Sequence, residues 1–160
     1  MLFRSQFTGL KARWVTLTVP NEPDRDAGLS KLKERFRRFS RTKLFNQHVI
    51  GGVSFYEWTQ SPDKGDWNVH YHGLWVGDYW PHETLLAEWQ GNSGVGGARI
   101  EGSGSTRKRI NYCVSYAKKQ TGTGLRLSQP FGCLYGTALA EIESALKLLD
   151  ESSIAGLALD

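Results

Sequence analysis

The stretch WNVHYHGLWV, from Trp67 to Val76, decides the fold. Its polar and apolar residues alternate, and many of them are aromatic or β-branched, which predicts a β-strand. Residues two apart in a strand share a face, so His70 and His72 point the same way, and Leu74 continues that face into a core. Two imidazoles on a rigid strand can supply two ligands of a metal site. Two ligands are too few, so a third must come from elsewhere in the chain.

The apolar segment 53–58 (VSFYEW) is the expected antiparallel partner of this strand, joined to it by turn residues between Thr59 and Asp66. Val53, Phe55 and Glu57 share one face of the segment. If the two apolar side chains pack on the same core as the histidine strand, Glu57 lies next to the histidines. The opposite face of the segment is also apolar, so this packing is not the only one possible. A lone His-x-His pair in a strand is usually two ordinary half-exposed side chains, so the case for a metal site depends on the other segments of the chain.

Length and composition favour one globular domain. The chain has 160 residues and six tryptophans, enough for a real core, and we expect one domain over 1–150 with a tail or linker over 151–160. No apolar run approaches the ~20 residues of a membrane span, and residues 1–10 lack the apolar region of a secretory signal. Cys113 and Cys133 give neither a zinc-finger pattern nor a disulfide framework. These features predict a cytoplasmic protein without a membrane partner.

The charge is unevenly distributed along the chain. The net charge is +4, and residues 131–160 contribute one Lys and five acids, or −4, which leaves +8 on the first 130 residues. Residues 27–45 form an expected amphipathic helix with basic residues on its outer faces and the single acid Glu34. A basic face suits a phosphate-rich partner, and it is equally consistent with a merely solvated helix.

Several shorter elements complete the expected fold. We expect strands at 14–19, 98–101 and 125–127, helices at 81–90 and 138–150, and a bulge or bend at Gly51-Gly52. The glycine-rich residues 91–105 lack the G-x-x-x-x-G-K-[ST] spacing, which excludes a nucleotide-hydrolysing phosphate loop. His48 and His82 do not share the histidine strand and are expected to be exposed.

A second informative element is the expected helix over 107–119. Tyr112, Tyr116 and Lys119 fall at i, i+4 and i+7, on one face beside an apolar stripe. The two tyrosines are either an aromatic pair that completes the core or two phenols available for chemistry.

Three segments in order resemble the motifs of the HUH endonucleases, and among these the two-tyrosine initiators of rolling-circle replication in plasmids and phages. WVTLTVPN at 14–21 is similar to their first motif, His70-Tyr71-His72 to their second, and Tyr112-x-x-x-Tyr116-x-x-Lys119 to the third. The resemblance covers residues 14–119. It departs from the family in Trp14, where Phe is usual, and in the lack of a Cys/His zinc module. It implies an α+β fold, with a central antiparallel sheet of about five strands and helices packed on it.

The resemblance also implies an activity. Such enzymes cleave single-stranded DNA at an origin hairpin through a tyrosine, leaving a 5′-phosphotyrosine and a free 3′-hydroxyl that primes replication with host helicase and polymerase. Tyr116 is expected to attack first, and Tyr112 to be the second nucleophile or a positioning group. A divalent metal, Mn²⁺ or Mg²⁺, is expected on His70, His72 and Glu57, where it would polarise the scissile phosphate. Lys119 would stabilise developing charge.

Other functions remain open from the sequence. A transposase or conjugative relaxase of the same HUH group would use the same chemistry on a different DNA. A non-catalytic origin-binding protein would keep the sheet and the basic surface but form no covalent adduct. An unrelated metal-dependent hydrolase would use His70 and His72 and need neither tyrosine.

Overall fold

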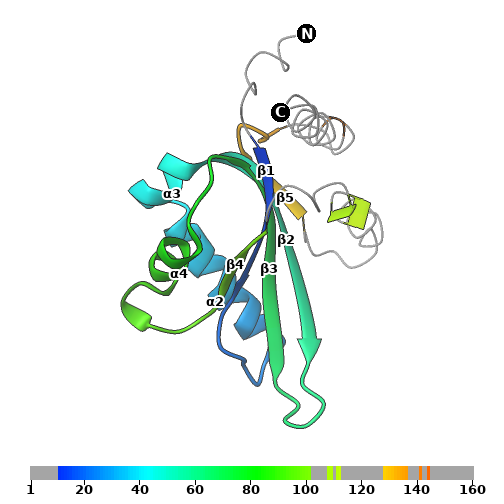
Figure 1. Ribbon diagram of the computed structural model, residues 1–160. Helices are drawn as coiled ribbons and strands as arrows, with labels where there is room; N and C mark the ends of the chain where they lie inside the picture. Colours follow the sequence, from blue (N-terminus) through cyan, green and yellow to red (C-terminus); the bar gives the residue numbers. More distant parts are fainter. Residues whose placement is uncertain are drawn as a thin grey trace.

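An antiparallel five-stranded sheet is the centre of the molecule (Figure 1). The computed structural model describes residues 11–101, 108, 109, 111, 112, 128–136, 141 and 144. Within these residues the strands are β1 (Lys11–Thr18), β2 (Val49–Gln60), β3 (Trp67–Gly77), β4 (Ala98–Ile100) and β5 (Ser128–Gly132), in the order β4-β1-β3-β2-β5. Every neighbouring pair is antiparallel. The predicted α+β class, with helices packed on an antiparallel sheet, is confirmed.

The helices that precede β4 pack on one side of this sheet (Figure 1). They are α2 (Arg25–Phe39), α3 (Lys43–His48), α4 (His82–Gln90) and the short 3-10 helix η1 (Gly91–Ser93). The prediction of one helix over 27–45 is wrong at its end. α2 ends at Phe39, and Thr42 begins a separate helix, because its backbone is extended and its hydroxyl accepts a hydrogen bond from the Phe45 amide as the cap of α3.

The core between the helices and the sheet is largely aromatic. The apolar stripe of α2 is buried as predicted, with Leu29, Leu32, Phe36 and Phe39 all inward. Phe36 stacks on Tyr71 of β3, with ring centroids 4.2 Å apart. Tyr71 stands between the two histidines in the sequence. Because side chains alternate along a strand, its contact with α2 places both histidines on the opposite face of the sheet.

The register of β2 and β3 fixes that opposite face. Glu57 pairs with His70, and Phe55 pairs with His72. The apolar residues that continue the same face, Val53, Phe55, Leu74 and Val76, are buried. The condition for placing Glu57 beside the histidines is therefore met.

Of the predicted bulge or bend at Gly51-Gly52, the structure shows a register shift at the start of this pair. The register of β2 against β3 shifts between Val49 and Gly51. A Cβ on Gly52 would lie 2.2 Å from the carbonyl oxygen of Leu74, so only glycine fits this close approach.

The C-terminal part of the sheet differs from the prediction. β5 pairs with β2 and contains Pro130, a residue that normally signals the end of a strand. Since β5 is an edge strand, one side of it needs no amide donors and tolerates proline. The predicted strand over 125–127, the helix over 138–150 apart from residues 141 and 144, and the tail 151–160 lie outside the described residues.

No helix of the described residues is both long enough and apolar enough to cross a membrane.

Candidate active site

Three side chains form a hydrogen-bonded row across the face of the sheet opposite the helices. Thr16 of β1, His72 of β3 and Glu57 of β2 stand on three adjacent strands. The Thr16 hydroxyl lies 3.1 Å from Nδ1 of His72, and Nε2 of the same ring lies 3.1 Å from Oε2 of Glu57. Both nitrogens of His72 are therefore engaged, and the ring is held from both edges.

His70 stands next to this row on the same strand. Its ring is parallel to that of His72, at 5° between the planes and 5.9 Å between the centroids. Burial lowers the pKa of His70, and the negative charge of Glu57 opposes this only in part. Burial also lowers the pKa of His72 against the effect of its hydrogen bond with Glu57. Both rings are therefore neutral at pH 7, which is the form in which imidazole binds a metal.

Glu57 joins the histidines to one of the two predicted tyrosines. The phenol of Tyr112 donates a hydrogen bond to Oε1 of Glu57 at 3.1 Å, while Oε2 holds His72. Tyr112 remains 45% exposed, so the phenol is both anchored and open to solvent. The structure thus brings Tyr112, Glu57 and the two histidines together. Tyr116 and Lys119 lie outside the described residues.

Aromatic and basic side chains extend the site beyond the predicted residues. The indole of Trp14 stacks on His72 with centroids 5.0 Å apart, and the guanidinium of Arg109 lies 5.1 Å from the centroid of Trp14. Arg109 Nη2 donates to both carboxylate oxygens of Glu101, at 3.0 and 2.9 Å. These contacts tie the segment bearing Tyr112 to the sheet.

The roles of Trp14, Arg109 and Glu101 were missed from the sequence. One signal was available for Arg109, which lies three residues before Tyr112 and hence on the same side of a helix. Trp14 was treated only as a departure from a motif. Glu101 follows β4, and only the pairing of β4 with β1 brings it beside the first motif.

The donor set fits a divalent metal. Two neighbouring ligands of an octahedral ion, each about 2.1 Å from it, lie about 3.0 Å apart. Nε2 of His72 and Oε2 of Glu57 are 3.1 Å apart, and His70 faces the same side. In the part of the chain that the structure describes, no three His, Cys, Asp or Glu side chains are already gathered around one point. His70, His72 and Glu57 therefore offer the right donors, and only His72 and Glu57 are in direct contact.

The other two histidines are not part of this site. His48 stacks on Trp80 at 4.9 Å and is half-buried, so the expectation that it is exposed is wrong. His82 is exposed as expected, and its Nε2 lies 2.9 Å from the carbonyl oxygen of Ala98.

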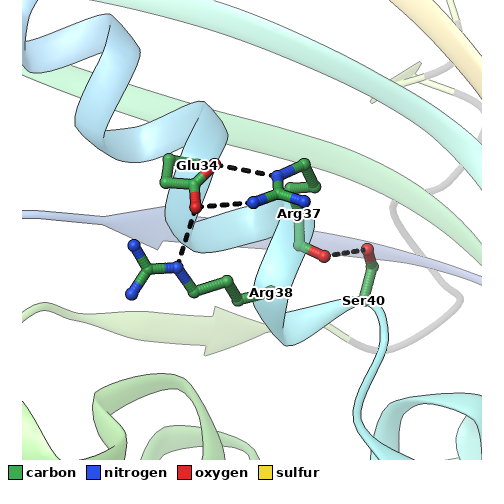
Figure 2. Close-up of polar contacts among 4 residues, drawn as sticks. All are labelled: Glu34, Arg37, Arg38 and Ser40. Atoms are coloured by element: carbon green, nitrogen blue, oxygen red, sulfur yellow. Dashed lines mark hydrogen bonds and ion pairs between the residues drawn. The ribbon is translucent and has the colours of Figure 1, made fainter.

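The basic surface of α2 lies on the other side of the sheet from the histidines. Figure 2 shows Glu34 bound to both Arg37 and Arg38, with contacts of 2.7 to 2.9 Å. These hydrogen bonds, first that of Arg37 and then that of Arg38, lower the pKa of Glu34 to about 2. Arg35 is half-buried and donates to the carbonyls of Trp89, Gln90 and Val95. Much of the predicted basic face therefore serves contacts within the protein.

Comparisons with known protein families, with curated proteins and with solved structures gave no significant match.

Proposed function

We propose that this protein is a site-specific single-stranded DNA endonuclease and strand transferase of the HUH type. In this proposal it nicks a replication origin to start rolling-circle replication. The observation that supports it most is the bridging position of Glu57, whose two oxygens bind the His72 imidazole and the Tyr112 phenol. The second and third sequence motifs, forty residues apart, thereby meet at one carboxylate.

His70, His72 and Glu57 are the residues that would hold Mn²⁺ or Mg²⁺. When bound, such an ion supplies positive charge that polarises the scissile phosphate. A set of nitrogen and oxygen donors favours Mn²⁺ over Mg²⁺, because Mg²⁺ is usually bound by oxygen ligands alone.

The tyrosines supply the covalent chemistry of the proposal. A tyrosine oxygen attacks the phosphorus and forms a phosphotyrosine with the 5′ end. The bond to the 3′ oxygen breaks, and that oxygen leaves as a 3′-hydroxyl. A phenol has a pKa near 10, so ionising it at pH 7 costs about 4 kcal/mol. A cation beside the phenolate lowers this cost, and Lys119, three residues after Tyr116, is the residue we propose for that role. Glu57 accepts the hydrogen bond of the Tyr112 phenol and so holds that phenol in place.

Two tyrosines have a use in strand transfer. One holds the 5′ end while the other attacks the regenerated origin, so the energy of the phosphodiester bond is kept. We propose Tyr116 as the first nucleophile, and Tyr112 as the second nucleophile or a positioning group. The proposed setting is the cytoplasm, with an origin hairpin as substrate and host helicase and polymerase as partners.

The test is a denaturing gel of the full chain mixed with labelled single-stranded DNA bearing candidate origin hairpins. Each reaction contains Mn²⁺ or a chelator, and the variants are Tyr116→Phe, Tyr112→Phe and the double variant. Tyr135→Phe is the matched control, because Tyr135 is 78% exposed and makes none of the hydrogen bonds of the site.

A protein-sized shift that survives denaturant, requires Mn²⁺ and disappears in Tyr116→Phe but not in Tyr135→Phe would support the proposal. A shift lost only in the double variant would make the two tyrosines interchangeable. Binding of a hairpin without any adduct would instead favour a non-catalytic origin-binding protein. Wild-type cleavage and joining by Tyr112→Phe would remove Tyr112 from the mechanism.

A further inference from the structure

Thr16 is the one member of the hydrogen-bonded row that has no assigned role. It lies on β1 directly opposite His72 of β3, and its hydroxyl is 3.1 Å from Nδ1. The other edge of the ring faces Glu57, and one flat side stacks on Trp14. The rotation of the His72 ring is thus limited on three sides, and Thr16 is the only polar contact to Nδ1 in the described residues.

The direction of the hydrogen bond at Nδ1 depends on what binds Nε2. A carboxylate only accepts hydrogen bonds, so Nε2 of a neutral His72 carries the ring proton when it faces Glu57. Nδ1 is then an acceptor, and the Thr16 hydroxyl donates to it. With Nε2 as a metal ligand, the ring proton sits on Nδ1 and the Thr16 oxygen accepts it.

A hydroxyl fits this position because it can do both. Its hydrogen rotates freely, and its oxygen keeps lone pairs available, so the contact between Thr16 and His72 survives either arrangement of the ring proton. A carbonyl could only accept and an ammonium could only donate. Valine has the same shape as threonine and can do neither.

We propose that Thr16 is a positioning residue that orients His72 for metal binding and reverses its hydrogen-bond role when the metal binds. This inference rests on the proposed metal site, and it adds a residue that acts through His72 without touching the metal or the DNA. Partners that orient a ligating imidazole in this way typically change metal affinity 10- to 100-fold.

Thr18 provides the matched control. It lies two residues further along β1, on the same face as Thr16 and opposite His70, and its hydroxyl accepts a hydrogen bond from the Gly97 amide at 3.0 Å. Removing either hydroxyl costs one hydrogen bond. Of the two, the described residues show only the Thr16 hydroxyl hydrogen-bonded to a candidate metal ligand, His72.

The experiment is calorimetric titration of the full chain with Mn²⁺, without DNA, for wild type, Thr16→Val, Thr16→Ser, Thr18→Val and His72→Ala. Urea unfolding of each variant checks that it is folded at the titration temperature. In parallel, long-range ¹H–¹⁵N spectra of the wild-type histidines report which ring nitrogen of His72 is protonated, before and after addition of diamagnetic Mg²⁺.

We expect Thr16→Val to bind Mn²⁺ at least about tenfold more weakly than wild type. We expect Thr16→Ser to bind within about threefold of wild type and Thr18→Val to equal it, because each keeps the hydroxyl at Nδ1. The spectra should show the proton of His72 on Nε2 without metal and on Nδ1 with Mg²⁺.

Equal binding by Thr16→Val and wild type, with both tighter than His72→Ala, would overturn the role of Thr16 and leave the metal site intact. Wild-type binding no tighter than that of His72→Ala would overturn the metal site itself, and the role of Thr16 with it. If Thr16→Val does not fold, weak binding by Thr16→Ser, or a His72 proton on Nδ1 already in the metal-free protein, would overturn the proposal.

Discussion

Replacing Tyr71 by Phe should destabilise the protein without changing the shape of its core. Tyr71 stands between the two histidines, is fully buried, and its phenol oxygen lies 2.9 Å from both Ser54 Oγ and Trp75 Nε1. The phenylalanine ring keeps the stack on Phe36 but leaves two buried polar groups without a partner. Each such group costs about 1–2 kcal/mol, so we expect a loss of about 2–4 kcal/mol in the free energy of unfolding.

Urea unfolding followed by tryptophan fluorescence measures this loss as a lower midpoint at an unchanged m value. For a chain of this length it corresponds to a decrease in melting temperature of about 5–15 °C. Tyr112→Phe is the matched control, since it removes a phenol that is 45% exposed, and it should cost less than about 1 kcal/mol.

The double variant Ser54→Ala, Tyr71→Phe tests the reason for the loss. It removes one of the two groups left without a partner, so it should cost less than the two single changes added together. A cost of Tyr71→Phe below about 0.5 kcal/mol, or equal to that of Tyr112→Phe, would refute the reasoning, because the buried hydroxyl would then contribute no more than an exposed one.

Three further results are expected. Burial lowers the folded-state pKa of His70 and His72, so in acid the unfolded chain takes up protons that the folded protein does not. The metal-free protein should therefore lose stability as the pH falls below about 6.5, and its urea midpoint should be lower at pH 5.5 than at pH 7.5. The difference between these two midpoints should be smaller in His72→Gln, which lacks one of the two imidazoles. Gly52→Ala should cost about 3 kcal/mol or more by the same urea assay, because its Cβ would lie 2.2 Å from a backbone oxygen, and a cost below about 1 kcal/mol would show that the strands separate easily. Arg35→Ala should speed amide hydrogen exchange in 91–97, because the guanidinium holds carbonyls at both ends of that loop, and unchanged exchange there would contradict this role.

The central sheet was largely predictable because strand alternation is a local property. The pattern around His70 and His72 placed both on one face, and the same two-residue period in the partner strand placed Glu57 beside them if both strands packed on the same core. The apolar stripe of α2 likewise followed from helical spacing. The break between α2 and α3 was missed because it depends on the Thr42 cap, whose signal is weaker than the periodicity around it.

Most contacts of the candidate site that the sequence did not reveal join segments far apart in the chain. Alternation could place Thr16 on a face, but only the pairing of β1 with β3 puts its hydroxyl against His72. The stacking of Arg109 on Trp14 arises in the same way, whereas the ion pair of Arg109 with Glu101 spans only eight residues. By itself the sequence determined which residues share a face, because local backbone geometry sets that period. Only the tertiary structure decided which faces meet, because strand order and packing depend on the whole chain.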